Sequence, residues 1–222
     1  MKVVIAGGHG KIALLLEQLL SRRGDAVTGL IRNPAQAEVL EEAGAQARLV
    51  DLEKATGDEV ARHLTGADAV VFAAGAGPGS SVGRKDSVDR GAAILLADAA
   101  ESPGVGPCLL LSAMGADLRA VDDESLDPVF RTYLRAKLAA ENALRSRSAL
   151  RATIVRPGLL NDTPGTGRVT LAEQTDPGPI SRADVAAVLL ALLDEPRLTG
   201  RTVEAIGGAT AVADAVAAHA AH

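Results

Sequence analysis

The chain has 222 residues, a length that suits one domain or one domain with a small appendage. Apolar residues make up 47% and charged residues 23%, but there are only two phenylalanines, one tyrosine and no tryptophan, so Val, Ile, Leu and Ala must build the core. The net charge of −5 and the lack of aromatic stacking platforms argue against a nucleic-acid or membrane surface.

The first 31 residues predict a strand, a glycine turn, a helix and a second strand. The strand covers Lys2–Ala6, the turn reads Gly7-Gly8-His9-Gly10-Lys11-Ile12-Ala13, a leucine-rich helix ends near Gly24, and the second strand covers Ala26–Ile31. Glycines let the backbone approach a pyrophosphate, and the free N–H groups of the helix N-terminus point at that anion. The alternative is an ordinary tight strand–helix connection, but the order of elements favours a nucleotide-binding unit.

The end of the second strand indicates which dinucleotide is bound. An acid there holds the ribose 2′-OH of NAD, whereas an arginine accommodates the 2′-phosphate of NADP. Arg32 occupies this place, no acid precedes the next helix, and Lys11 in the turn offers a second positive charge. The sequence therefore predicts NADP(H) in preference to NAD(H), with a surface arginine ahead of a helix cap as the alternative.

Helices and strands continue to alternate through the rest of the chain. Continuous apolar strands between helices predict a doubly wound parallel sheet with helices on both faces, a Rossmann-type α/β fold in a single domain over 1–222. The acidic segment Ala116–Asp127 is expected to form an irregular loop and a lid, and the region 157–167 is rich in Gly, Pro and Thr. The expected helices are Ala35–Ala43, Asp58–Leu64, Gly83–Ala100, Pro128–Ser146, Arg182–Leu193 and Ala209–Ala220, and the expected strands are Ala47–Val50, Ala69–Ala73, Cys108–Leu111, Ala152–Val155 and Thr202–Ile206.

Tyr133, the only tyrosine, lies four residues before Lys137 on an expected helix. Residues at this spacing share one side of a helix, so the ammonium is expected to favour the phenolate and to lower the tyrosine pKa toward neutrality. Such a tyrosine can donate or accept a proton in catalysis. The alternative is an amphipathic helix whose one aromatic packs while a lysine lies at its rim.

These motifs together resemble the short-chain dehydrogenase/reductase superfamily, in particular its small atypical NAD(P)-binding members, the NmrA-like and flavin-reductase-like group. The resemblance covers essentially the whole chain. It depends on the glycine turn, Asp51-Leu52, Ala73-Ala74-Gly75, Leu111-Ser112-Ala113-Met114-Gly115, Tyr133 with Lys137, Val155-Arg156-Pro157-Gly158 and Ile180-Ser181-Arg182-Ala183-Asp184-Val185.

The resemblance implies a position on the cofactor for several residues. Gly7, His9, Gly10, Lys11 and Ile12 belong to the turn that holds the pyrophosphate. Asp51 accepts a hydrogen bond from the adenine amino group and Leu52 lies against the adenine ring, although Asp51 also suits a helix cap. Ala74 and Gly75 line the cofactor because small residues permit close backbone approach.

The resemblance also implies the catalytic residues. Lys137 hydrogen-bonds the nicotinamide ribose and biases Tyr133, which passes a proton to the substrate carbonyl oxygen as hydride reaches carbon, and Pro157 lies beside the nicotinamide. Ser112 is the only hydroxyl at the end of the fifth strand. In longer relatives the acting hydroxyl lies two positions further on, where this chain has Met114, so Ser112 either holds substrate or caps the strand.

The expected function is an NADPH-dependent oxidoreductase that reduces a small carbonyl, quinone or flavin-like acceptor. The alternatives are a redox sensor that binds NADP(H) without turnover, and an epimerase or dehydratase that uses its cofactor transiently. The substrate-side region is expected at 116–130 and 157–180. One cysteine, Cys108, and four histidines offer no metal site, and a monomer or homodimer in the cytoplasm is expected, with no membrane segment.

Overall fold

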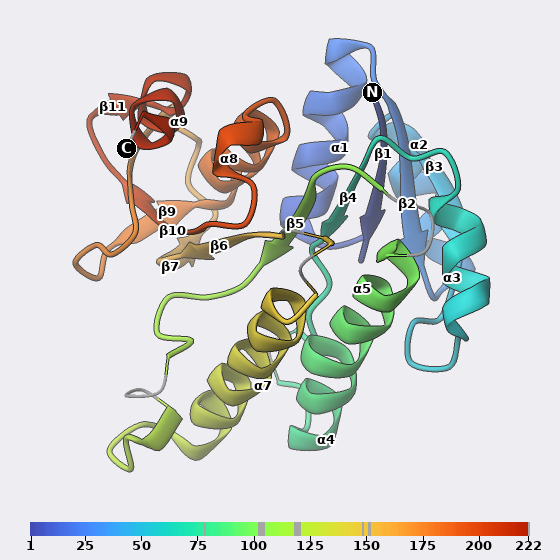
Figure 1. The fold of residues 1–222 in the computed structure, drawn as a ribbon, viewed down its shortest axis with the longest axis horizontal. Coiled ribbons are helices and arrows are strands. Elements are labelled where there is room, and N and C mark those ends of the chain that lie inside the picture. Colours follow the sequence, from blue (N-terminus) through green and yellow to red (C-terminus); the bar gives the residue numbers. More distant parts are fainter. Residues whose placement is uncertain (78, 102–104, 118–120, 148, 151, 222) are drawn as a thin grey trace.

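The strands form one large twisted sheet through the middle of the molecule and a small two-stranded sheet beside it (Figure 1). The computed structural model describes residues 1–77, 79–101, 105–117, 121–147, 149–150 and 152–221. The strands are β1 (Lys2–Ala6), β2 (Ala26–Ile31), β3 (Gln46–Leu49), β4 (Ala69–Phe72), β5 (Cys108–Leu111), β6 (Thr153–Pro157), β7 (Leu159–Asn161), β8 (Arg168–Ala172), β9 (Pro179–Ser181), β10 (Thr202–Gly207) and β11 (Thr210–Ala211).

The order of strands in the large sheet is β11-β8-β10-β6-β5-β4-β1-β2-β3. Pairing is parallel from β3 to β10, while β8 runs antiparallel to β10 and to β11. The chain proceeds outward from β1 in both directions, so the crevice beyond the carboxyl ends of β1 and β4 is the topological switch point where open α/β sheets bind ligands.

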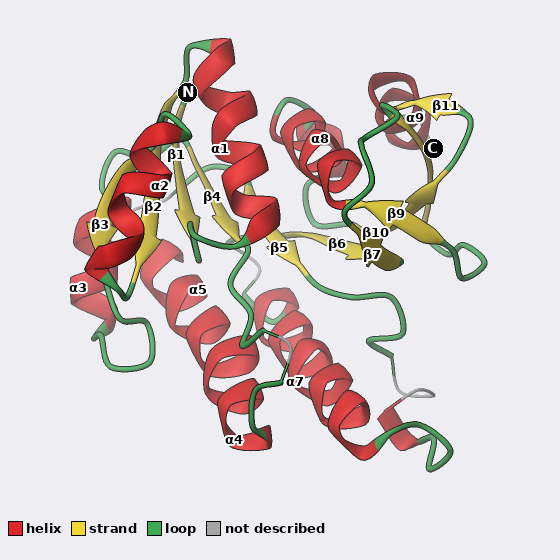
Figure 2. Ribbon diagram, turned by 180° about the vertical axis from the view of Figure 1, so that it is seen from behind, coloured by secondary structure: helices red, strands yellow, loops and turns green. Residues whose placement is uncertain are grey.

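Helices cover both faces of the sheet (Figure 2). On one face, α1 and α8 pack through Leu16 and Leu189, and on the other, α3, α5 and α7 pack through Val60, Leu96 and Ala140. The predicted doubly wound α/β fold is confirmed. The helices are α1 (Lys11–Arg23), η1 (Pro34–Gln36), α2 (Ala37–Glu42), α3 (Gly57–Leu64), α4 (Val82–Arg84), η2 (Lys85–Ala92), α5 (Ala93–Glu101), α7 (Pro128–Arg145), α8 (Arg182–Leu193), η3 (Pro196–Leu198) and α9 (Val212–Ala220).

The helix expected over Gly83–Ala100 contains a wide turn. Its residues Lys85–Ala92, η2, are π-helical and lie between the α-helical segments α4 and α5. Such a turn shifts the side chains before it relative to those after it, and π-helical turns are frequent at functional sites. The two ends of this helix therefore present side chains in directions that a regular 3.6-residue period does not predict.

The carboxyl-terminal third contains strands that the sequence interpretation did not include. The predicted parallel sheet is extended at this edge by β8, which pairs antiparallel with β10. Its other partner, β11, takes the first residues of the helix expected over Ala209–Ala220. The Gly/Pro/Thr-rich region 157–167 also holds β7, which pairs with β9. Part of the expected acidic lid, residues 118–120, lies outside the described residues.

Candidate functional site

The glycine turn joins the end of β1 to the start of α1 at the switch point. Gly7 has a φ of +82°, and a Cβ there would lie 2.5 Å from Ala74 Cα, so only glycine fits. The N–H groups of Gly7 and Gly8 donate to Leu30 O at 3.2 and 3.1 Å, which holds the turn against β2. Gly10 is the N-cap of α1 and supplies no side-chain cap, so the first N–H groups of the helix are left for an anion.

The turn forms one wall of a cavity of about 270 Å³. The other walls come from the ends of β2, β3 and β4 and from the helix α4–η2. This composition matches a dinucleotide site, because glycines and alanines allow backbone approach while polar groups converge at one end. The lining residues are Gly7, His9, Gly10, Leu30, Ile31, Arg32, Gln36, Val50, Asp51, Leu52, Glu53, Ala73, Ala74, Gly75, Ala76, Arg84, Val88 and Ala92.

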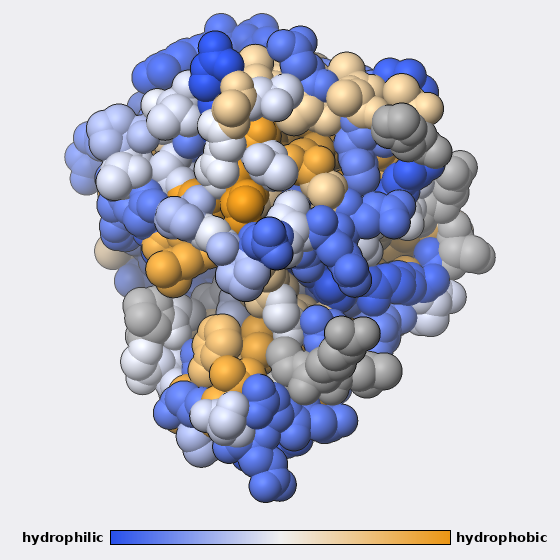
Figure 3. Space-filling view, turned by 90° about the vertical axis from the view of Figure 1, so that its left-hand side faces the viewer, coloured by the Kyte–Doolittle hydropathy of each residue, from blue (hydrophilic) through white to orange (hydrophobic). Residues whose placement is uncertain are grey.

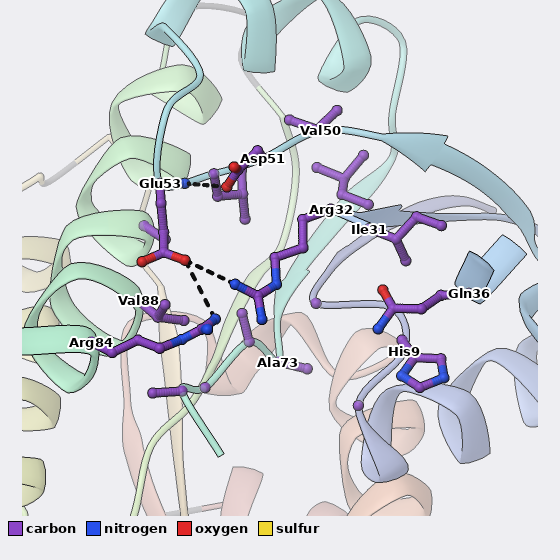
Figure 4. Close-up of a pocket in the computed structure, with 18 residues that line it drawn as sticks. His9, Ile31, Arg32, Gln36, Val50, Asp51, Glu53, Ala73, Arg84 and Val88 are labelled. Atoms are coloured by element: carbon purple, nitrogen blue, oxygen red, sulfur yellow. Dashed lines mark hydrogen bonds and ion pairs between the residues drawn. The ribbon is translucent and has the colours of Figure 1, made fainter. Parts of the chain in front are cut away.

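Two arginines face one carboxylate in this cavity (Figure 4). Arg32, after β2, donates from Nη1 to Glu53 Oε2 at 3.2 Å, and Arg84 Nη2 of α4 lies 3.4 Å from the same oxygen. Ser87 Oγ donates to Glu53 Oε1 at 2.6 Å. Arg32 thus lines the cavity as the sequence predicted. Glu53 and Arg84, which the sequence did not predict, lie beside it.

Asp51 and Leu52 lie on the same side of the cavity, directly after β3. Asp51 Oδ1 accepts from the Glu53 N–H at 3.1 Å, and Lys54 Nζ lies 3.3 Å from Asp51 Oδ2. One carboxylate oxygen therefore holds the turn after β3, and the alternative of a helix cap is wrong, because Thr56 is the N-cap of the next helix, α3. Both residues line the cavity, as an adenine site requires, and their contacts with adenine stay a prediction.

Four residues predicted to touch the cofactor lie outside the cavity lining. Lys11 is exposed and its Nζ donates to Asp162 Oδ2 at 2.7 Å, so its charge is already paired. Ile12 is buried and packs in the core below the turn. Pro157 is buried at the end of β6, and Lys137 is buried on α7. Of these, only Lys137 belongs to a second polar cluster.

This second cluster joins Tyr133, Lys137 and Asp89. Lys137 is 4% exposed, its Nζ lies 3.1 Å from Asp89 Oδ1, and it donates to Leu111 O at 3.1 Å. The ammonium lies 5.7 Å from the centre of the Tyr133 ring. Asp89 Oδ2 accepts from Ala76 N–H at 3.2 Å, and Ala76 lines the cavity. The cluster therefore adjoins the cavity at Ala76.

The expected lowering of the Tyr133 pKa is contradicted. Burial raises the pKa of this phenol above 10.0, the nearby Lys137 charge lowers it by less, and the Asp89 charge raises it further. The sequence interpretation counted the ammonium alone, whereas in the structure Asp89 offsets much of that charge. Tyr133 is consequently a neutral phenol at physiological pH.

Ser112 is buried and its hydroxyl is committed to a network of charged groups. Its Oγ donates to Glu141 Oε1 at 2.5 Å, and Arg156 donates to both oxygens of Glu141, from Nε at 2.9 Å and from Nη2 at 2.7 Å. Ser112 is also absent from the cavity lining. The structure thus places Ser112 with the residues that join β5, α7 and β6, and it gives the hydroxyl no position facing the cavity.

Sequence reasoning missed Glu53, Arg84 and Asp89. Asp89 carried a usable signal, since it lies on the same stripe of the expected helix as the buried Ala93 and Ala97, where an acid requires a partner. Glu53 and Arg84 carried no such signal, because charged residues in a loop and at a helix start are normally solvated.

Two further findings concern the described part of the chain. Nowhere in it do three or more His, Cys, Asp or Glu side chains gather in an arrangement able to hold a metal ion. In the same residues, every helix is too short or too polar to cross a membrane.

Comparison with known proteins agrees with the geometry of the cavity. The model of the NAD(P)H-binding family matches residues 7–196. A Bacillus subtilis protein named "uncharacterized sugar epimerase YhfK" is 36% identical over 217 residues, covering 97% of this chain and 99% of its own. A solved Bacillus halodurans structure, named for an NAD-dependent epimerase/dehydratase, is 33% identical with a TM-score of 0.88 and covers 98% of this chain and 99% of its own.

A more distant relative carries a reductase name. The Escherichia coli O157:H7 structure titled anaerobillin reductase ChuY is 25% identical with a TM-score of 0.76, covering 93% of this chain and 97% of its own. The chain belongs to the NAD(P)H-binding family, an oxidoreductase-like group, and the proteins similar to it carry both reductase and epimerase names. The resemblance drawn from the sequence motifs is confirmed at this level, and a nicotinamide dinucleotide is the cofactor class that the family binds.

Proposed function

We propose that this protein is an NADPH-dependent oxidoreductase that transfers hydride to a small carbonyl, quinone or flavin-like acceptor. The observation that carries the proposal is one cavity in which an uncapped glycine turn and two arginines face the same space. The turn suits a pyrophosphate, and the arginines suit the 2′-phosphate that distinguishes NADPH from NADH. The bound reduced nicotinamide supplies the hydride.

Tyr133 and Lys137 suit the proton-transfer side of the reaction. Gly75 lines the cavity, and a Cβ there would lie 3.2 Å from Asp89 Oδ1, so the cavity wall and the cluster are neighbours at this residue. Lys137 would hold the nicotinamide ribose and Tyr133 would donate its phenol proton to the substrate oxygen. Because its pKa is raised, Tyr133 holds this proton throughout the physiological range, which favours reduction over oxidation.

The proposed substrate side consists of residues 116–130 and 157–180. Phe130 of α7 is 47% exposed, its ring stacks on Tyr133 with centres 6.0 Å apart, and Leu159 of β7 is 76% exposed. Figure 3 shows apolar side chains in patches among charged ones, with a hollow between the upper body and the lower projection of this face. The exposed Phe130 ring against Tyr133 supports a planar acceptor such as a quinone or flavin.

A redox sensor without turnover is the second candidate. It is favoured by Ser112, whose hydroxyl faces Glu141 and so leaves Tyr133 without a second hydroxyl partner for a substrate carbonyl. The epimerase alternative is supported by the names of the two Bacillus relatives. Steady oxidation of NADPH by an added acceptor separates the first proposal from both alternatives.

The buried thiol of Cys108 bears on the compartment. Burial raises the pKa of the Cys108 thiol to about 12, so this cysteine is unreactive and suits a reducing compartment such as the cytoplasm. We propose a monomer or homodimer there, acting on a small molecule and not on nucleic acid.

The test is an assay of NADPH oxidation with a quinone, flavin mononucleotide and a small aldehyde as separate acceptors. We expect turnover with at least one acceptor, at least tenfold faster with NADPH than with NADH at low cofactor concentration. Tyr133→Phe should lower turnover by roughly 10²–10⁴ while cofactor affinity changes little. Tight NADPH binding with no oxidation in the presence of any acceptor would replace the reductase with the sensor.

A further inference from the structure

Three donors hold Glu53, and Figure 4 shows two of them, Arg32 and Arg84. Arg32 follows β2, Arg84 ends α4 and Ser87 lies in η2, and all three point at the one carboxylate that follows β3. The Glu53 side chain is 25% exposed, against 49% for Arg32 and 32% for Arg84. The carboxylate thus lies at the wall of the cavity, where a bound ligand would meet the same donors.

The positive charge around Glu53 exceeds the single negative charge of its carboxylate. Oε2 of Glu53 serves both guanidinium groups, at 3.2 and 3.4 Å, while Oε1 is taken by Ser87. Arg84 Nε is buried and has no hydrogen-bond partner among the described residues. Two guanidinium charges and a hydroxyl around a single negative charge form the site that a phosphate, with three acceptor oxygens and nearly two negative charges, satisfies more fully.

We infer that Glu53 occupies the subsite of the cofactor's 2′-phosphate and is a specificity-determining residue that the phosphate displaces. This inference rests on the proposed preference for NADPH. Arg84 is then the second phosphate-binding residue, opposite Arg32. Binding of NADPH becomes an exchange of anions, in which the carboxylate leaves the two guanidinium groups and the phosphate takes its place.

The exchange has a consequence for the two cofactor types. A ligand without the 2′-phosphate leaves Glu53 on its arginines and loses nothing. A ligand with the phosphate must break two ion pairs before it makes its own, so Glu53 lowers the affinity of phosphate-bearing ligands selectively. Removing the Glu53 charge should therefore widen the preference that Arg32 and Arg84 create.

The experiment uses adenosine 2′,5′-bisphosphate and adenosine 5′-monophosphate as probes, with affinities measured by calorimetry on the full chain. Glu53→Gln should bind the bisphosphate about threefold to tenfold more tightly, as expected when a partly exposed competing ion pair is lost, with less than a twofold change for the monophosphate. Arg84→Gln should bind the bisphosphate about tenfold more weakly and leave the monophosphate unchanged. Glu42→Gln and Arg62→Gln, at exposed positions of α2 and α3, are the matched controls.

A double variant tests the contact itself. If Glu53 acts by holding Arg84, the increase in bisphosphate affinity caused by Glu53→Gln should be at least twofold smaller when Arg84→Gln is also present. Glu53→Asp keeps the negative charge and moves it back by one methylene, so its affinity for the bisphosphate should rise less than that of Glu53→Gln. This second variant keeps the test possible if Glu53→Gln folds poorly.

The outcomes separate the two proposals. If both probes bind Glu53→Gln more weakly, or if neither affinity changes, the role given to Glu53 is wrong. The proposed preference for NADPH is still supported in that case if the wild-type chain binds the bisphosphate more tightly than the monophosphate. Equal binding of both probes by the wild-type chain overturns the NADPH preference itself.

Discussion

Glu17 makes the stability of this protein depend on pH in a way that one substitution should remove. The residue lies on α1 beneath the glycine turn, is fully buried, and has no hydrogen-bond partner for either carboxylate oxygen among the described residues. A Cβ on Gly8 or Gly29 would lie 2.9 or 2.7 Å from its Oε1, so these two glycines leave the space that the carboxyl fills. Burial raises the pKa of Glu17 from 4.5 to about 8.

The sign of the effect follows from where the proton is held. The folded chain keeps the Glu17 proton up to about pH 8, whereas the unfolded chain releases it near 4.5. Its contribution to stability is therefore complete below 4.5 and is lost as pH rises through about 8. Between these values the loss is about 1.4 kcal/mol per pH unit, and the whole interval amounts to at most about 5 kcal/mol. That is comparable to the entire stability of a marginal domain.

Glu17→Gln removes the titration and keeps the shape. We expect the wild-type free energy of unfolding to fall by about 2 kcal/mol more than that of the variant between pH 6 and pH 8. Urea unfolding followed by circular dichroism measures this difference, since the chain has no tryptophan. Exposed Glu42→Gln is the control and should keep the wild-type slope. Parallel pH profiles for wild type and Glu17→Gln would show that the carboxyl is ionised in the folded protein.

Three further substitutions test the site. Arg32→Ala should reduce the preference for NADPH to the part that Arg84 supplies, a loss of about 1.5–3 kcal/mol for the phosphate-bearing cofactor, with NADH affinity in fluorescence titration nearly unchanged. Gly10→Val should fold, because the φ of −66° suits any residue and the tight 3.2 Å contact of a Cβ with Gly7 O needs a shift of only a few tenths of an ångström, yet it should lose NADPH binding; retained affinity would make the turn merely structural. Turnover in the reducing direction should not fall through ionisation of Tyr133 at any pH up to about 10, because the pKa of this phenol is raised. If turnover instead fell as pH rose past about 7, and this fall were absent in Tyr133→Phe, the raised pKa would be contradicted.

The fold and the pyrophosphate turn were predictable because their signals are local. Gly7 and Gly10 lie between a strand and a helix that are continuous in sequence, and Arg32 follows directly at the end of the next strand. The parallel register of β1 with β2 then brings the turn and Arg32 to one edge of the sheet. No long-range contact had to be known for these assignments.

The polar partners were not predictable because each comes from a distant segment. The sequence shows only that Ser112 is a hydroxyl at the end of a strand. The packing of α7 against this strand end is needed to see that the hydroxyl donates a hydrogen bond to Glu141. The position of Lys11 in the glycine turn indicates a phosphate ligand, but in the structure its Nζ lies 2.7 Å from Asp162 Oδ2, in the segment after β7. The antiparallel strand β8 was hidden for a related reason, since its partner β10 follows it only after β9, α8 and η3.

Both ends of the proposed cofactor site depend on the wide-turned helix. Arg84 and Ser87 reach Glu53 from its first turns, and Asp89 reaches Lys137 from the same π-helical segment. A substitution at Arg84 that moved the segment would therefore also disturb the neighbourhood of Tyr133. A change in phosphate recognition with an unaltered Tyr133 pH profile identifies a local effect at Arg84. Parallel changes in both would instead show that the helix has shifted as a unit, since one segment supplies the acid for Lys137 and the donors for Glu53.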